Sequence, residues 1–202
     1  MEGSMFYWIS WSFWVYLTFF LNKQNPYRFK LAAAILMLIA LSTLHFRLGN
    51  IDIFASGLFL LFLTFILISK EKLRAIIYFF ICSYIIGISY VTFHLFEIFD
   101  PIWIILKKEW MMGILLGYLA ILLQKTLRGR LLIVLNGTMQ GEILYTIILS
   151  KYHFPYSIGT FAYLDVCALI SFLLVGWSFF ENAGTIFQNH FNFTEKAKQK
   201  SS

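Results

Sequence analysis

The sequence has little charge, little proline and almost no cysteine. Only 13% of its 202 residues are charged, and it contains 3 prolines and 2 cysteines. Too few polar side chains remain to cover a water-soluble globule of this length. Cys82 and Cys167 both lie in apolar segments, without a CxxC pair or a Cys/His ligand spacing. This pattern argues against a disulfide framework and against a structural zinc site, so we predict no metal.

Motifs of known enzyme classes are also missing from the sequence. It has no glycine-rich phosphate loop with lysine, no GxSxG motif and no cysteine nucleophile near a histidine. We therefore predict a non-enzymatic protein without a cofactor. The formal net charge is +6, but lysine and arginine occur in short clusters between apolar runs. No basic surface interleaved with aromatic residues results, so we expect no nucleic-acid partner.

Apolar residues, by contrast, are abundant. The chain is 60% hydrophobic and 20% aromatic, with a mean hydropathy of +0.76. Helices can face lipid because each satisfies its own backbone hydrogen bonds. The composition therefore predicts an all-α fold, a polytopic transmembrane helical bundle whose first partner is the lipid bilayer.

Seven apolar runs come close to the roughly 20 residues that a membrane-spanning helix needs. The fifth run is extended at its start because Asp100 is placed as an N-cap, with Pro101 at the first helical position. Residues 1–202 are thus predicted to form one membrane domain, and residues 181–202 a short basic cytoplasmic tail. The predicted spans are residues 5–21, 29–46, 53–69, 75–96, 101–123, 131–149 and 157–180.

The distribution of lysine and arginine predicts the orientation of the chain. Alternate loops should differ in positive charge, because cytoplasmic loops are enriched in lysine and arginine. One set of loops carries only Arg47, Lys107, Lys108 and Lys151. The other set, which includes the C-terminal tail, carries Lys23, Arg28, Lys30, Lys70, Lys72, Arg74, Lys125, Arg128, Arg130, Lys196, Lys198 and Lys200. We therefore predict seven spans with the N-terminus outside and the C-terminus inside.

The sixth span contains an unusual group of polar residues. Asn136, Thr138, Gln140 and Glu142 lie within seven positions of an otherwise apolar run. On a helix, Asn136 and Gln140 share one side, and Thr138 and Glu142 share another. Bare polar groups that face hydrocarbon cost several kcal/mol each. The sixth helix is therefore predicted to lie at the centre of the bundle, covered by protein on most sides.

Asp165, in the seventh span, is the other acid deep inside a predicted helix. At about 1.5 Å rise per residue, Asp165 and Glu142 lie at similar depths in consecutive antiparallel helices. The two acids could share a proton, bind a cation or face different partners. Intramembrane acids are costly and are therefore candidates for function. In the alternative interpretation, neighbouring polar groups satisfy them and they only give the bundle its specificity.

Small residues four positions apart predict close contacts between helices, since they let helix backbones approach. We expect a tight contact between the fifth and sixth helices, or between one of them and the fourth. The residues concerned are Gly113 and Gly117, Gly137 and Gly141, and Ser83 and Gly87.

Two classes of function are compatible with these features. The first is a non-enzymatic membrane component that contacts a membrane-protein partner or a second copy of the chain. The second is a small transporter or proton-linked permease that uses the polar residues of the sixth and seventh helices.

The opening "MEGSMFYWISW", the seven short-looped spans and the basic tail together resemble the YphA family of small integral membrane proteins from spore-forming bacteria. The resemblance covers the whole chain. It implies a multi-pass protein of the bacterial plasma membrane, and it assigns no catalytic or binding residue.

Overall fold

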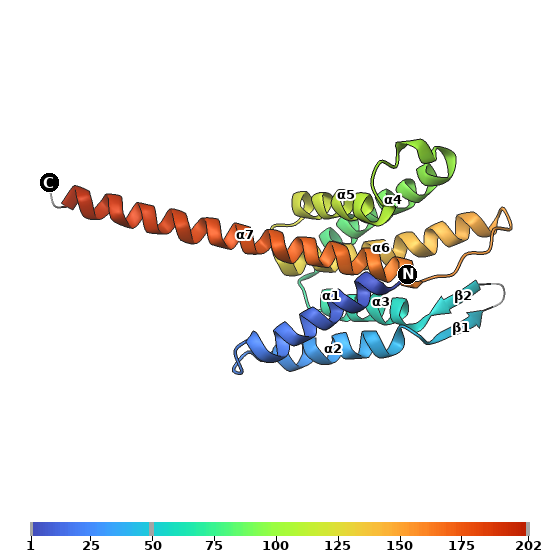
Figure 1. The fold of residues 1–202 in the computed structure, drawn as a ribbon, viewed down its shortest axis with the longest axis horizontal. Helices are drawn as coiled ribbons and strands as arrows, with labels where there is room; N and C mark the ends of the chain where they lie inside the picture. The colour runs from blue at the N-terminus through green and yellow to red at the C-terminus, as the bar shows by residue number, and fades with distance from the viewer. Residues whose placement is uncertain (1, 49–50, 201–202) are drawn as a thin grey trace.

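The computed structural model describes the backbone of residues 2–48 and 51–200, and the side chains of residues 2–47 and 51–184. The fold is mostly helical, with one short β-hairpin (Figure 1). Its elements are α1 (Ser4–Val15), a π-helix (Tyr16–Phe20), α2 (Arg28–Leu41), β1 (His45–Leu48), β2 (Ile51–Phe54), α3 (Ala55–Ile68), α4 (Leu73–Phe99), a 3-10 helix (Pro101–Trp103), α5 (Lys108–Leu123), α6 (Leu127–Ser150) and α7 (Phe161–Lys200).

The connections alternate between the two ends of the bundle. The loops that join α1 to α2, α3 to α4 and α5 to α6 lie toward the end from which α7 projects (Figure 1). The hairpin and the loops before α5 and α7 lie toward the other end. These connections are short, so successive helices run in roughly opposite directions.

α6 lies at the centre of this arrangement. It contacts α3, α4, α5 and α7, and 61% of its most apolar stretch is buried, against 39% for α4 and 44% for α7. Its buried residues fall on all sides of the helix, including Asn136, Thr138 and Glu142. The polar residues therefore sit where the surrounding helices shield them.

α4 and α6 pack closely because glycines line their contact. A Cβ atom on Gly137 would lie 2.4 Å from the Ser83 carbonyl oxygen, and one on Gly141 would lie 2.8 Å from the Gly87 carbonyl oxygen. Of the small-residue spacings in the sequence, these two meet each other. A Cβ atom on Gly113 would instead lie 3.0 Å from Leu169 Cδ2 of α7, and one on Gly117 would meet no heavy atom within 4 Å.

The β-hairpin was not expected from the sequence, which predicts helix through residue 46. α2 ends at Leu41, where the buried Ser42 hydroxyl donates to the Ile39 carbonyl oxygen at 2.7 Å. β1 and β2 then pair antiparallel, and β2 also bonds to Ile158 through Phe54 N and Asp52 O, both at 2.9 Å. The added pairing satisfies backbone groups that a hairpin edge would leave open.

The fifth helix begins later than expected, at Lys108 rather than Pro101. Asp100 caps only a 3-10 turn, accepting from Ile102 N at 3.2 Å, and the backbone turns extended at Ile104, so the helix does not continue. The Trp103 ring packs against the Phe93 ring of α4, with ring centroids 5.0 Å apart. This contact holds the short turn against the C-terminal end of α4, and a new helix then starts.

The seventh helix begins at Phe161 rather than at residue 157. Residues 151–160 return along the bundle, and Gly159 has a φ of +75°, a conformation that glycine adopts readily. The helix continues past the predicted span and through most of the predicted tail, to Lys200. Residues 201–202, and the side chains of Lys196, Lys198 and Lys200, lie outside the described residues.

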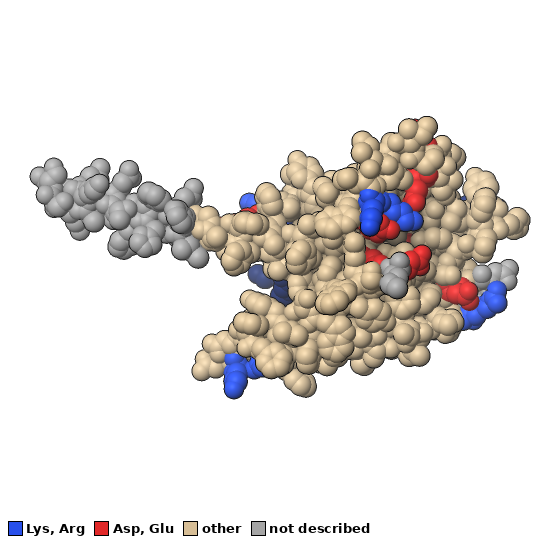
Figure 2. Space-filling model, viewed as in Figure 1, with Lys and Arg blue, Asp and Glu red and all other residues tan. Residues whose placement is uncertain are grey.

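The surface of the bundle is largely apolar. Figure 2 shows that most of the face in view carries no charge and that the charged side chains form a few small groups. Large hydrophobic side chains are widely exposed, among them Trp8, Phe29 and Phe179 at 78%, 81% and 72%. Within the described residues, three helices are long and apolar enough to cross a membrane: 73–99, 127–150 and 161–184.

Candidate functional site

The amide side chains of α6 form a short chain of hydrogen bonds to α3. Gln140 Nε2 donates to Asn136 Oδ1, and Asn136 Nδ2 donates to Thr64 Oγ1 at 3.1 Å. The Thr64 hydroxyl in turn donates to the Leu61 carbonyl oxygen at 2.8 Å. Asn136 and Thr64 are fully buried. This chain of hydrogen bonds therefore cross-links α6 and α3.

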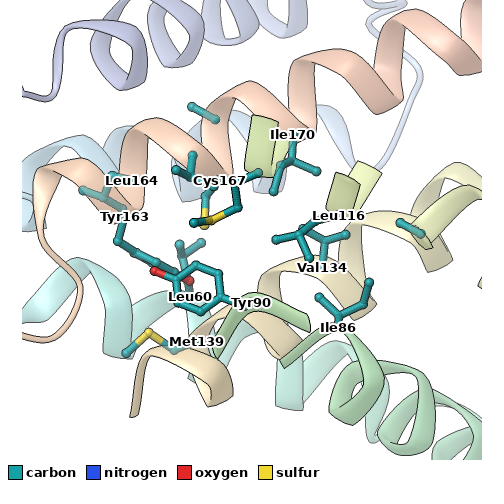
Figure 3. Packing of buried hydrophobic residues seen from close by; sticks show 14 of the residues in the cluster. Leu60, Ile86, Tyr90, Leu116, Val134, Met139, Tyr163, Leu164, Cys167 and Ile170 are labelled. Atoms are coloured by element: carbon teal, nitrogen blue, oxygen red, sulfur yellow. The ribbon is translucent and has the colours of Figure 1, made fainter. Parts of the chain in front are cut away.

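Thr138 lies on the side of α6 that faces α7. Its hydroxyl donates to the Val134 carbonyl oxygen at 2.8 Å, within its own helix. It also lies 3.4 Å from the Tyr163 hydroxyl and 3.6 Å from Cys167 Sγ. Figure 3 shows Tyr163 and Cys167 projecting from α7 toward Tyr90 of α4 in the same buried region. The Thr138 hydroxyl thus lies beside α7, in the region where α6, α7 and Tyr90 of α4 pack together.

Glu142 binds side chains and backbone from two further elements. Tyr90 of α4 donates its hydroxyl to Glu142 Oε2, and Tyr156 lies 3.2 Å from each carboxylate oxygen. The Gly159 N–H donates to Oε1 at 3.4 Å. Burial, together with the nearby carboxylate, raises the pKa of the Tyr156 phenol far above its ordinary value. Tyr156 therefore stays protonated and acts as a hydrogen-bond donor.

A line of ionisable side chains leads from this carboxylate toward the C-terminal end of α4. The His94 ring stacks on Tyr145 at 4.9 Å and lies edge-on to Tyr90 at 4.7 Å. His94 Nδ1 is 3.2 Å from Glu97 Oε2, and Lys108 Nζ is 3.2 Å from Glu97 Oε1. His94 Nε2 is buried without a hydrogen-bond partner. His94 therefore contacts both Tyr90, which donates to the buried acid, and Glu97 of the partly exposed ion pair.

Asp165 has a different role from Glu142. Its Oδ2 accepts from Gly3 N, and its Oδ1 accepts from Phe6 N, both at 2.7 Å. These N–H groups belong to the first turn of α1, where no carbonyl of the same helix is available to accept them. Asp165 is only 6% exposed. A carboxylate of α7 thus caps α1 and complements the positive end of its dipole.

Four of the five predicted polar residues therefore lie on α6, and each of them has a hydrogen-bond partner. Each of the two acids accepts from its own set of donors. Among the described residues, no three of His, Cys, Asp and Glu are grouped so that they could hold a metal ion. Tyr90 and Tyr156 were not singled out from the sequence. Nothing in their sequence neighbourhood marks them, because their partner lies 52 and 14 residues away.

Long apolar helices, a surface rich in exposed hydrophobic side chains and buried polar groups at the centre define an integral membrane protein. The chain belongs to the YphA-like integral membrane protein family, whose model matches residues 2–200. It is 27% identical over 187 residues to a protein of Bacillus subtilis (strain 168) named "Uncharacterized protein YphA", covering 90% of each chain. No solved structure matches.

Proposed function

We propose that the chain is a non-enzymatic, multi-pass component of the bacterial plasma membrane. The observation that carries this proposal is that four buried polar side chains of α6 and α7 bond to other elements of the fold: Asn136, Thr138, Glu142 and Asp165. They connect α6 to α3, α4, α7 and the loop after α6, and α7 to α1. A pathway for solutes needs groups that can exchange partners with water or substrate. A cross-link between helices needs only the bonds that are present.

The proposed architecture has seven spans with the N-terminus outside. α2 and α3 have 14 residues each, about 21 Å at 1.5 Å per residue, which is shorter than a hydrocarbon core of about 30 Å. β1 follows α2 after residues 42–44 and β2 directly precedes α3, and each strand of 4 residues adds about 13 Å. This extension supports a crossing by both segments. The proposal also includes contact with a membrane-protein partner or a second copy of the chain.

Labelling of single cysteines tests this topology. In a background with Cys82 and Cys167 replaced by alanine, Asn25→Cys and Tyr152→Cys place one thiol at each end of the bundle. A membrane-impermeant maleimide applied to intact cells should label Tyr152→Cys and leave Asn25→Cys unreacted until the cells are opened. Labelling of both sites in intact cells contradicts the proposed orientation.

A second candidate function is a proton-linked permease. It is favoured by the line from Lys108 through Glu97 and His94 toward Glu142, since histidine and carboxylates are the usual carriers in membrane proton relays. In this alternative, protons would enter from the outer end of α4 and reach the buried carboxylate.

Reconstitution in liposomes separates the two functions. Proton flux and unfolding free energy are measured for the original protein, Glu142→Gln and Asp165→Asn, with Asp52→Asn in the partly exposed hairpin as a matched control. The proposed structural role predicts lower stability for the first two variants and no flux that depends on the protein. A protein-dependent flux that Glu142→Gln abolishes, with folding intact, establishes the permease and overturns the structural role.

A further inference from the structure

A cavity of about 270 Å³ lies where the π-helix after α1 meets the start of α2. It lies at the end of the bundle that carries most of the lysine and arginine. Its walls combine hydrogen-bond donors with apolar carbon. The lining residues are Thr18, Lys23, Asn25, Arg28, Phe29 and Ala32.

The polar wall of this cavity offers donors that the protein does not use. Thr18 Oγ1 is buried and has no hydrogen-bond partner. Arg28 donates Nε–H to the Leu17 carbonyl oxygen at 3.1 Å and one further N–H to the Thr18 carbonyl oxygen. A guanidinium has five N–H donors, so others remain for a ligand. The Asn25 side-chain oxygen Oδ1 accepts from Tyr27 N at 3.0 Å, and the side-chain NH₂ is left to donate.

No acid balances the positive charge at this cavity. The sequence has no Asp or Glu between Glu2 and Asp52, and neither Lys23 nor Arg28 forms an ion pair with any described residue. Arg28 also ties the π-helical turn to the start of α2, through its bonds to the Leu17 and Thr18 carbonyl oxygens. A single-turn π-helix is rare and is frequently found at functional sites.

The surroundings of the cavity are those of a membrane surface. Phe20, Tyr27 and Phe29 are 76%, 63% and 81% exposed. Aromatic side chains that surround cationic ones are typical of the zone where lipid headgroups meet acyl chains. A ligand whose anionic group reaches Lys23 and Arg28, and whose other part covers Phe29 and Ala32, must carry apolar chains.

We propose that this cavity binds the phosphate of an anionic phospholipid. Lys23, Arg28 and the Thr18 hydroxyl hold the phosphate oxygens, and Phe29 and Ala32 contact the acyl chains. The inference requires only that this end of the bundle meets a bilayer surface, and it holds whether the chain is a structural component or a permease. The topology and flux experiments therefore fail or succeed independently of it.

The test is a lipid titration of the purified full-length protein in a neutral detergent. Dioctanoyl phosphatidylglycerol, dioctanoyl phosphatidylcholine and inorganic phosphate are added in separate arms, and the thermal unfolding midpoint is followed. The variants are Lys23→Gln and Thr18→Val. Lys125→Gln is the matched control, because it removes an equal charge from an exposed side chain at the same end of the bundle.

Phosphatidylglycerol should raise the midpoint saturably, whereas phosphatidylcholine and inorganic phosphate should not. Lys23→Gln and Thr18→Val should each weaken the apparent affinity by about tenfold, as expected for loss of one hydrogen bond to a charged group, and Lys125→Gln should leave it unchanged. An equal response to inorganic phosphate overturns the assignment to lipid. Equal weakening by Lys125→Gln shows unspecific surface attraction and overturns the site.

Discussion

Glu142 and Asp165 are both acids buried in neighbouring apolar helices, yet the protein uses them differently. Asp165 accepts backbone N–H groups from Gly3 and Phe6 at the start of α1. Glu142 accepts two tyrosine hydroxyls and one backbone N–H, and its neighbour Tyr90 also contacts His94. The bonds to Asp165 end at the first turn of α1, whereas those to Glu142 lie beside a line of ionisable groups.

The difference shows that the cost of a buried acid does not by itself identify a functional site. The N–H groups of a helix start cannot be satisfied within that helix, so a carboxylate there replaces a cap that the sequence of α1 lacks. The donors to Glu142 include two tyrosine hydroxyls, whose positions depend on how α4 and the loop after α6 pack against α6. The donors to Asp165 are backbone N–H groups of a helix start, which need an acceptor wherever that helix lies.

The largest effect is expected for Asp165→Ala. It removes both acceptors from two buried N–H groups, and we expect a loss of about 3 kcal/mol in unfolding free energy. SDS titration in mixed micelles measures this loss. Asp165→Asn is the matched control, because its amide oxygen still accepts one bond and should restore about half of the loss. Equal stability of Asp165→Ala and the original protein would remove the capping role.

Glu142→Gln should have the next largest effect, about 2 kcal/mol. The amide oxygen can still accept from Tyr90 and Tyr156 at the position of Oε2, but the NH₂ group then faces the Gly159 N–H, which loses its acceptor. The same micelle titration measures it. A loss larger than that of Asp165→Ala contradicts the view that Asp165 is the more rigidly required of the two acids.

Tyr156→Phe should cost about 1 kcal/mol, the usual net value of one hydrogen bond. Its hydroxyl and Glu142 act as a unit, so the losses for Tyr156→Phe and Glu142→Gln should not add in the double variant. Additive losses, measured in the same titration, mean that the two side chains do not interact. Tyr152→Phe, an exposed tyrosine in the same loop, is the control and should be neutral.

The smallest effect is expected for His94→Phe, below about 1 kcal/mol. The phenyl ring keeps the stacking on Tyr145, and the substitution removes the buried Nε2, which has no hydrogen-bond partner. The lost contact with Glu97 is partly exposed and contributes little. If stability is kept but a proton flux disappears, His94 belongs to a relay, and the region around Glu142 is more than a structural cross-link.

Much of the helical framework could be predicted from residue patterns. The apolar runs give the approximate ranges of the helices, and Asn136, Thr138, Gln140 and Glu142 indicate a helix covered by protein. Local turns were harder to predict. The strands at residues 45–48 and 51–54 and the 3-10 turn at Pro101–Trp103 lie in apolar segments whose composition predicts helix. Their backbone conformation depends instead on pairing to Ile158 and on packing against Phe93.

By itself, the sequence determined that this chain is an integral membrane protein and that two acids lie in its apolar helices. This follows from composition, since so few charges cannot cover a soluble surface. Only the tertiary structure decided that one acid caps α1 and the other binds tyrosines. The reason is physical: the partners of Asp165 are 162 and 159 residues away, and one partner of Glu142 is 52 residues away. Contacts over such separations depend on how the helices pack, which local patterns do not encode.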